Sequence, residues 1–431
     1  MFTVISTAHK KGEGRVRRIP FPAVALTALL VLVGCTQGAT GIFADIEQEV
    51  QIKKSNLVDN TFVASVVQAD TGPGPRYFAV AGTKLFARST AGGNWSAAGN
   101  PSGRTVAQYV AALPGAGDPD ELYGVFARTD GEQESRLFRL VSGAWEAVTL
   151  PEGAPAANVT GLAAVDSTGG DTADTLLATV EASSGKRYLV VNPQSSAVFH
   201  EFQNADGSES NGEDLGANRP VGKAMVAAGR LWLSRNGLWF IPVEDLVNEG
   251  TPLTRVRTPA NLGSFEFVAA DPDDSDEGFL VLVTLNGGMY SSPKPDLTTA
   301  TTGDEIKAWT SESWSSLGSL GRAFSNVLWL PGIGTEGRGR FLVSTISYGN
   351  RSSRGYFHAD PAADFESVAF AEPQGNYRST EMRLAGVSGM VMIRDVGGPG
   401  GTVFALTESK GLWATPSYLA GQENEPEWRW E

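Results

Sequence analysis

An apolar-aromatic pair of residues recurs along the chain, each time after a short turn that contains glycine or a basic residue. The pairs are Leu85-Phe86, Leu137-Phe138, Tyr188-Leu189, Leu238-Trp239, Met289-Tyr290, Tyr356-Phe357 and Leu412-Trp413. These seven copies follow one another at intervals of about fifty residues, and insertions lengthen two of the intervals. A chain with this period folds as an array of similar units, none of which buries its apolar surface alone.

Three more runs accompany each pair in a constant order. Just upstream lies a strand-like run, at 76–80, 122–126, 175–180, 231–233, 279–283, 341–345 and 403–406. Further upstream is a run of small and β-branched residues, at 62–67, 106–113, 159–165, 221–228, 265–270, 326–330 and 387–393. A weaker outer run is anchored by aromatic residues, namely Trp95, Trp145, Phe199, Trp309 and Trp428. Turn residues between the runs predict hairpins, and therefore four strands in each repeat.

Seven repeats of four antiparallel strands predict an all-β fold, a seven-bladed β-propeller over residues 61–431. Small residues in the first run suit the innermost strand of a blade, where neighbouring blades crowd at the axis. The alternative is a β-sandwich of unrelated hairpins, which need not keep one order of runs through seven copies. A helical fold is excluded here, because long 3.6-residue apolar periodicity is absent and Gly (51) and Pro (23) are frequent.

The N-terminal segment predicts an exported protein. Basic residues such as Lys10 and Arg17 precede an apolar run that is shorter than the ~20 residues needed to span a bilayer. The run ends in Leu32-Val33-Gly34-Cys35, which resembles the lipobox of bacterial lipoproteins. The resemblance implies a signal peptide over 1–34 and a Cys35 that carries diacylglycerol and a further acyl chain such as palmitate. A plain transmembrane anchor is the alternative.

Residues 35–60 are then expected to form a lipid-anchored tether, in which Ile46–Lys54 is the one stretch that favours a short helix. Thr36, rather than an aspartate, follows the cysteine, so by the same resemblance the outer membrane or the cell surface is expected ahead of the inner membrane. Since Cys35 is the only cysteine, disulfides and thiolate catalysis are excluded from the remaining chain. A net charge of −14 disfavours nucleic acid as a partner, and nothing in the sequence indicates a cofactor.

The repeat resembles the Asp-box, or BNR-type, propellers of sialidases and sortilin-like receptors. The stretch closest to their motif, Ser-x-Asp-x-Gly-x-Thr-Trp, is Ser89–Trp95, which lacks the aspartate and is one residue shorter. The resemblance implies the propeller architecture. The arginine triad, tyrosine nucleophile and acid/base aspartate of the sialidases have no matching motif here, so the activity is not carried over.

Few residues are candidates for metal binding or acid/base catalysis. His200 and His358 each follow an aromatic residue and are expected to have ordinary surface roles, because neither a catalytic triad nor a zinc site has the partners it needs. The acidic stretch containing Asp271, Asp273, Asp274 and Asp276 is a weak calcium candidate, since calcium prefers hard oxygen ligands. Its spacing departs from that of an EF-hand, and a solvated turn between the first and second strands is the favoured interpretation.

Two insertions provide candidate binding residues. One is the basic, aromatic turn with Tyr348, Arg351 and Arg354, and the other is the polar connection with Trp314. Arginine and aromatic side chains on loops are common binding anchors. We therefore predict a non-enzymatic binding or scaffolding module for a protein or glycan partner, held at the membrane by its lipid. A sialidase-like glycoside hydrolase and a factor similar to propeller lipoproteins of outer-membrane protein insertion are the alternatives.

Overall fold

The computed structural model describes Leu57 and residues 61–431, apart from short gaps of which the longest are 151–157, 209–222 and 395–400. Contacts divide the chain into residues 1–52 and residues 53–431, and the described residues all belong to the second unit. Cys35 and the stretch Ile46–Lys54 therefore lie outside the described residues.

Each run of the repeat forms a strand. The first strands are β1 (Val63–Asp70), β5 (Val106–Leu113), β9 (Asn158–Val165), β13 (Lys223–Ala227), β17 (Leu262–Asp271), β21 (Ala323–Leu330) and β25 (Val387–Arg394). The second strands are β2 (Pro75–Ala81), β6 (Glu121–Ala127), β10 (Thr175–Glu181), β14 (Arg230–Ser234), β18 (Asp274–Thr284), β22 (Arg340–Ile346) and β26 (Gly401–Thr407).

The apolar-aromatic pairs form the third strands, and the weaker outer runs correspond to the fourth. Of the predicted anchors, Trp95 and Trp428 lie directly before their strands, whereas Trp309 is misplaced, because the fourth strand of its sheet begins only at Ser315. The third strands are β3 (Lys84–Arg88), β7 (Ser135–Val141), β11 (Arg187–Val191), β15 (Leu238–Pro242), β19 (Gly288–Ser291), β23 (Tyr356–Pro361) and β27 (Leu412–Thr415). The fourth strands are β4 (Ser96–Ala97), β8 (Ala144–Ala147), β12 (Val198–Gln203), β16 (Leu253–Val256), β20 (Ser315–Ser319), β24 (Val368–Ala371) and β28 (Arg429–Trp430).

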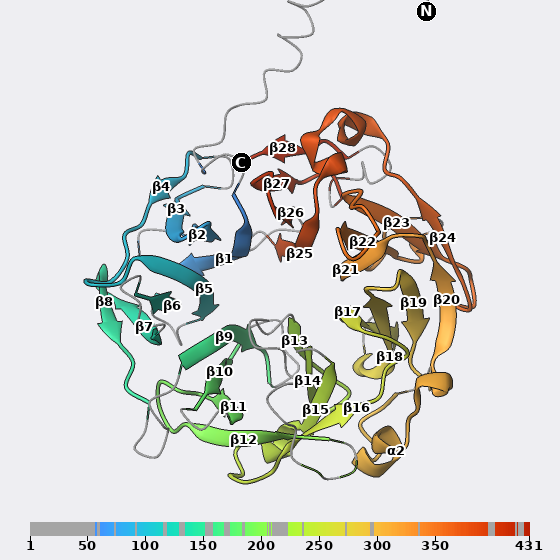
Figure 1. The fold of residues 1–431 in the computed structure, drawn as a ribbon, viewed down its shortest axis with the longest axis horizontal. Helices are drawn as coiled ribbons and strands as arrows, with labels where there is room; N and C mark the ends of the chain where they lie inside the picture. The colour runs from blue at the N-terminus through green and yellow to red at the C-terminus, as the bar shows by residue number, and fades with distance from the viewer. Residues whose placement is uncertain are drawn as a thin grey trace, which may run out of the picture. The chain divides into compact units, whose positions relative to one another are not determined.

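The strands pair in sequence order. In the described residues there are five antiparallel sheets of four strands and one sheet of eight. The larger sheet consists of two four-stranded units, β9–β12 and β13–β16, which are joined where β12 and β16 pair in parallel. The sheets follow one another around a ring with the first strands at its centre (Figure 1). This arrangement is a β-propeller, as the repeat predicts.

The core lies between neighbouring sheets. Seven clusters of buried side chains each combine residues of two consecutive four-stranded units, and the last joins the final unit to the first. Second strands such as β10 and β26 are buried almost throughout, because neighbouring sheets cover both of their faces. The first strands contain both buried and half-buried residues. Each sheet therefore depends on both neighbours for its burial.

The ring closes by packing rather than by exchange of a strand. The sheet β25–β28 is completed by its own fourth strand, and β1 begins the next sheet. Leu57 and Phe404 are buried in the cluster between these two sheets. Leu57 thus contributes its side chain to the closure of the ring without forming a strand.

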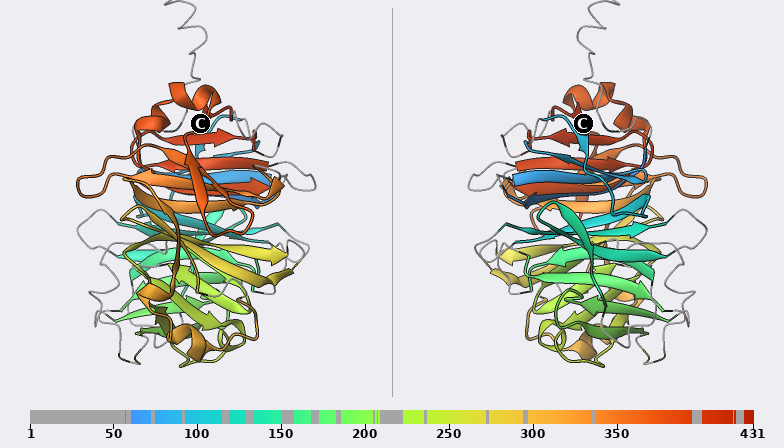
Figure 2. Two further views of the ribbon diagram at one scale, coloured as in Figure 1. Left: turned by 90° about the vertical axis from the view of Figure 1, so that its right-hand side faces the viewer. Right: turned by 90° about the vertical axis from the view of Figure 1, so that its left-hand side faces the viewer.

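Short helices occupy some connections: η1 (Val243–Asp245), α2 (Gly303–Lys307), η2 (Ser311–Ser313), η4 (Gly375–Ser379) and η5 (Glu381–Leu384). No helix among the described residues is both long enough and apolar enough to cross a membrane. Strands run largely along the ring axis, from one face to the other (Figure 2). Successive turns of each sheet therefore lie on opposite faces.

Candidate binding face

One face of the ring carries both the second-to-third-strand turns and the connections between sheets. The two kinds of segment are hydrogen-bonded to each other: Gly355 N donates to Ala385 O at 3.0 Å, and Glu408 N donates to Gly386 O at 2.8 Å. We call this the binding face. The first-to-second-strand turns lie on the opposite face. The loop with Tyr348 joins β22 to β23 and belongs to this face. Trp314 lies in the connection from β19 to β20, within one sheet, so the topology does not place it among these segments.

The loop between β22 and β23 has a fixed conformation. The backbone N–H groups of Tyr348 and Arg351 each donate to the carbonyl of the other at 3.1 Å, around Gly349 at φ +60°. The Thr345 hydroxyl accepts from Arg354 N at 2.7 Å. Because these backbone hydrogen bonds already order the loop, the loop loses little conformational entropy when a partner binds. Its side chains are therefore presented in a preformed arrangement.

Tyr348 and Arg351 extend toward the neighbouring sheet. The Arg351 guanidinium donates to Leu285 O at 3.1 Å, and the Asn261 amide donates to the Tyr348 hydroxyl at 3.5 Å. Tyr348 nevertheless remains 37% exposed. The loop therefore bridges two sheets while part of Tyr348 stays exposed.

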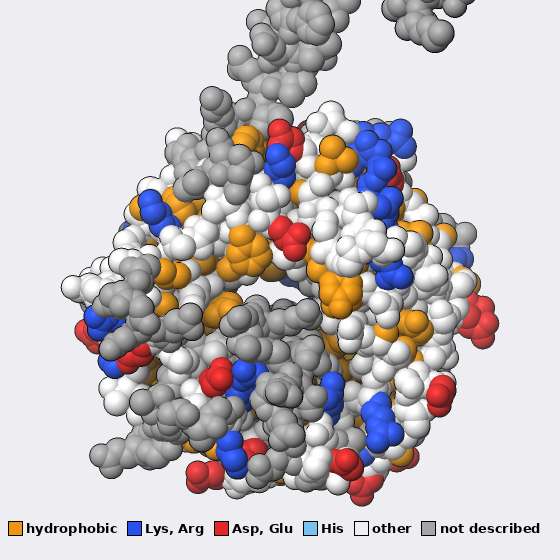
Figure 3. Space-filling model, in the orientation of Figure 1, with side chains coloured by type: hydrophobic (Ala, Val, Ile, Leu, Met, Phe, Trp, Pro, Cys, Tyr) orange, Lys and Arg blue, Asp and Glu red, His pale blue; other side chains and the backbone are white. Residues whose placement is uncertain are grey.

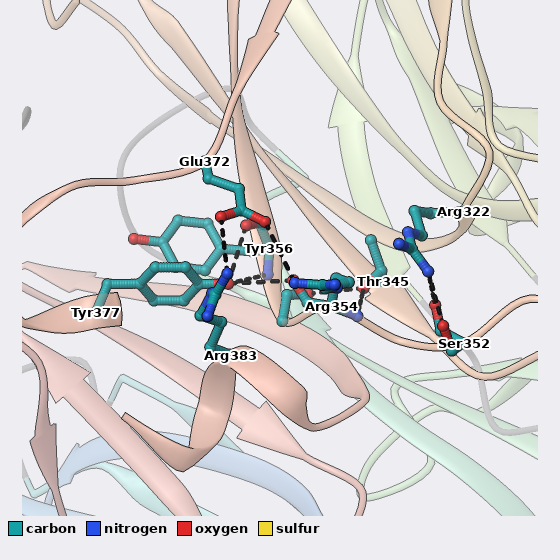
Figure 4. Close-up of polar contacts among 9 residues, drawn as sticks. Arg322, Thr345, Ser352, Arg354, Tyr356, Glu372, Tyr377 and Arg383 are labelled. Atoms are coloured by element: carbon teal, nitrogen blue, oxygen red, sulfur yellow. Dashed lines mark hydrogen bonds and ion pairs between the residues drawn. The ribbon is translucent and has the colours of Figure 1, made fainter. Parts of the chain in front are cut away.

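Arg354 lies in a network with the helical connection to the last sheet (Figure 4). Its guanidinium is 3.8 Å from Glu372, which also pairs with Arg383 at 3.4 Å. The Tyr377 hydroxyl donates to Arg354 O and accepts from Tyr356 N at 3.2 Å. Burial raises the pKa of Tyr377, so it stays protonated and keeps this donor.

Positive charge gathers on this part of the binding face. Lysine and arginine side chains crowd over the region of β21–β28 in Figure 3. Arg354 and Arg383 pair with the same carboxylate. Arg322 donates a hydrogen bond to the uncharged hydroxyl of Ser352. Arg378 on η4 is exposed. Leu384, beside Arg383, is 70% exposed. The area thus combines arginines with an apolar and an aromatic side chain, on a chain whose net charge is −14.

A pocket of about 480 Å³ opens on the same face. Its described lining residues come from the end of β16 and the connection after it, from the stretch after β12, and from η2. They are Arg255, Val256, Arg257, Thr258, Ala260, Asn261, Asn204, Asp206 and Ser311. Asn261 also contacts Tyr348, so the pocket adjoins the β22–β23 loop. Sequence patterns did not point to this pocket, because its two arginines lie at the end of β16 and directly after it, in a stretch without glycine or aromatic residues.

Trp314 is placed differently from the other candidate binding residues. It is 6% exposed, packs edge-to-face against Trp309, and belongs to the cluster between two sheets. Its indole N–H donates to Arg257 O at 2.9 Å. An exposed anchor was expected, but Trp314 is buried because its connection folds back over the sheet edge. Its contact with Arg257 makes it a support of the pocket.

The backbone of three acidic calcium candidates, Asp271, Asp274 and Asp276, lies toward the opposite face. Asp271 and Asp274 pair across β17 and β18, and Asp276 follows in β18. Asp273 and the side chains of this stretch lie outside the described residues. Strand pairing up to Asp271 and Asp274 agrees with a hairpin turn. In the part of the chain that the structure describes, no three His, Cys, Asp or Glu side chains are grouped to hold a metal ion.

Both histidines are buried, so the expected surface roles are wrong. His200 places Nδ1 2.7 Å from Thr251 O and Nε2 3.1 Å from Leu246 O. These contacts tie strand β12 to the connection after η1. The sequence suggests that His200 lies at an exposed strand end, but Thr251, 51 positions away, covers it.

His358 joins a buried chain of polar groups between the last two sheets. Its Nε2 is 2.6 Å from the Tyr418 hydroxyl, which is 2.5 Å from the Tyr356 hydroxyl. Trp428 donates its indole N–H to Tyr356 at 2.9 Å. Burial, and then the nearby Arg340, lower the pKa of His358 to about 3. The neutral imidazole accepts a hydrogen bond in this chain, and its place is structural.

Glu266, in the middle of an innermost strand, pairs with Lys223 of the preceding sheet. The same carboxylate accepts from Trp329 N at 3.4 Å, so it links three first strands. Asn326 similarly bridges Ser264 and Met390 N. Polar side chains at the ring centre thus connect blades to each other.

The fold and this face define a β-propeller with an arginine-rich surface and an adjoining polar pocket. No protein-family model and no curated protein sequence matches the chain. Among solved structures, an ancestral GH74 enzyme is similar, with 14% identity and a TM-score of 0.56 over 87% of this chain. Identity at this level supports the fold alone.

Two further structures match less closely. YCF48 bound to D1 peptide is 11% identical with a TM-score of 0.45, covering 83% of this chain and 92% of that chain. The extracellular domain of the hybrid two-component system BT4673 from B. thetaiotaomicron is 10% identical with a TM-score of 0.49 over 83% of this chain. The chain spans 38% of the latter and 47% of the GH74 enzyme.

Proposed function

We propose that this chain is an exported, lipid-anchored, seven-bladed β-propeller that acts as a non-enzymatic binding or scaffolding module at the cell envelope. A protein or glycan partner docks on the binding face, with Tyr348, Arg351 and Arg354 at its centre. Cys35 holds the module at the outer membrane or the cell surface through its acyl chains. Two such chains are needed because a single one binds a membrane only marginally.

The observation that carries this proposal is the clustering of arginines with exposed Tyr348 and Leu384 on a preformed surface. Arginine and tyrosine are enriched among the residues that dominate binding energy at interfaces. Because the chain as a whole is acidic, a local positive surface steers a partner of complementary charge to this face.

The blade count rests on the seven repeats and on the two units within the eight-stranded sheet. The lipoprotein assignment rests on Leu32-Val33-Gly34-Cys35. A sialidase-like hydrolase would require a carboxylate free to act near the axis, whereas Glu266 is engaged by Lys223 and Trp329. If the protein instead assists the assembly of outer-membrane proteins, the same binding face would be used, and the partner would be a protein rather than a glycan.

Differential co-purification tests the proposal. Full-length protein is solubilised from its own membranes in mild detergent, and bound proteins and glycans are quantified. Combined Tyr348→Ser and Arg351→Gln substitutions should deplete a specific component about tenfold or more. The matched control, Arg338→Gln with Arg394→Gln near the opposite face, should retain it. A set of bound components that neither variant changes would contradict the proposal.

A further inference from the structure

The pocket beside the β22–β23 loop has the composition of an anion site. The guanidinium groups of Arg255 and Arg257 supply charged donors, and the Asn261 amide and Ser311 hydroxyl supply neutral ones. A planar guanidinium forms paired hydrogen bonds with a carboxylate. Among the described residues, the Arg257 side chain forms no ion pair within 4 Å, and its charge acts on the Asp206 carboxylate at the edge of the pocket.

The structure holds these groups in place before any ligand arrives. Arg255 lies 5.7 Å from the centre of the Trp239 ring, which restricts its side chain. Trp314 fixes the backbone of Arg257 through its carbonyl. Asn261 O accepts from Leu285 N at 2.9 Å at the end of the connection. A site built on such supports loses little entropy on binding.

Asp206 is the one carboxylate among the described residues that line the pocket, and it limits which anion fits. Asp206 accepts from the Ser208 N–H at 3.0 Å and from its hydroxyl at 2.6 Å. These bonds, and then Arg257, lower the pKa of Asp206, so it stays ionised. A fixed negative charge at the edge opposes a doubly charged phosphate more than a singly charged carboxylate. None of the described residues that line the pocket is aromatic, so they offer a sugar ring no stacking surface.

We propose that this pocket captures a carboxylate side chain from an acidic peptide segment of the partner protein. The segment continues over Tyr348, which Asn261 connects to the pocket. The inference rests on the proposed binding function and specifies the chemistry of the partner. It assigns the partner as a protein rather than a glycan.

Fluorescence anisotropy with labelled hexaglutamate and hexaglutamine peptides tests the site, using the full-length protein at low and at ~0.15 M salt. Hexaglutamate should bind and hexaglutamine should not. Arg257→Gln should raise the dissociation constant about tenfold, the usual effect of removing a charge-assisted bond. Arg378→Gln, an exposed arginine elsewhere on the same face, should change it less than about twofold.

Equal losses in both arginine variants would overturn the proposal, because they would indicate general charge attraction. Tighter binding of a phosphoserine peptide or of oligogalacturonate would overturn the choice of a peptide carboxylate. If hexaglutamate fails to bind while the co-purified component still depends on Tyr348 and Arg351, the pocket assignment fails and the proposed function stands. If hexaglutamate fails to bind and no co-purified component depends on Tyr348 and Arg351, both the pocket assignment and the proposed function are rejected.

Discussion

The guanidinium of Arg88 on β3 pairs with the carboxylate of Glu431, beside β28, so an ion pair joins the first sheet to the last. The Arg88 side chain is 1% exposed and lies 4.4 Å from the centre of the Trp95 ring. Burial lowers the pKa of Arg88 to about 10, which still leaves it charged at neutral pH. The seam of the ring, where the sheet β1–β4 meets the sheet β25–β28, therefore contains a buried arginine whose counter-ion is the Glu431 carboxylate.

Glu431→Gln should destabilise the protein by about 3 kcal/mol, because it leaves the Arg88 charge buried without its counter-ion. Urea unfolding measures the change. The control is Glu201→Gln, whose pair with Lys186 at 3.7 Å is about half exposed on both sides and should cost less than about 1 kcal/mol. Equal effects of the two substitutions would contradict a special role of the seam.

Gly355→Ala should cost about 3 kcal/mol of stability. Gly355 has φ +58°, and an added Cβ would meet the Tyr377 hydroxyl and the Met382 carbonyl. Gly349→Ala in the same loop is the control, since Gly349 has φ +60° but open space around it, and it should cost about 1 kcal/mol. Thermal or urea unfolding of both variants gives the difference, and equal costs would show that the packing around Tyr377 is looser than described.

His358 should make the fold sensitive to acid. The unfolded chain protonates this residue near its ordinary pKa of 6.5, whereas the folded chain does so only near 3. The stability is therefore fully present above pH ~6.5 and is lost as the pH falls toward 3. Between pH 7 and pH 5 the wild type should lose about 2 kcal/mol more than His358→Gln. Parallel pH profiles of the two proteins would refute this assignment.

Trp314→Phe should weaken hexaglutamate binding severalfold while leaving the fold intact, because it removes the N–H that fixes Arg257 O. Trp309→Phe alters the same aromatic pair without touching Arg257 and serves as the control. Anisotropy titrations compare the two. An equal loss of affinity in both variants would mean that packing alone, rather than the bond to Arg257, supports the pocket.

Cys35→Ser should move the protein from the membrane fraction to the supernatant of lysed cells, since it removes the thiol that carries the acyl chains. Fractionation followed by immunoblotting measures the distribution. The folded propeller should keep its unfolding midpoint, which separates loss of the anchor from loss of the fold. Retention in the membrane would favour a plain transmembrane anchor.

The repeat made most strands predictable. The run Val106–Leu113 forms β5 over the same residues, because small and β-branched residues mark the innermost position throughout the chain. Helix α2 was not predicted. Thr302 and Glu305, three residues apart, form a capping box, and this spacing is a sequence signature of a helix N-terminus that could have revealed it.

The site was only partly predictable. Tyr348, Arg351 and Arg354 could be found because a basic, aromatic turn is unusual in an acidic chain. The burial of Trp314 and His358 depends on contacts with Arg257 and Tyr418, about sixty positions away, which no local pattern encodes. Arg257 is a candidate binding residue only because the folded chain places it in the lining of a pocket.

Photo-crosslinking in cells tests the central claim most directly. A benzoylphenylalanine is placed at Tyr348 on the binding face or at Glu277, an exposed residue near the opposite face. The account predicts a discrete partner adduct from position 348 and none from position 277, with the adduct diminished by Arg351→Gln. Adducts from position 277 alone, or none from position 348, would contradict a partner-binding role for this face.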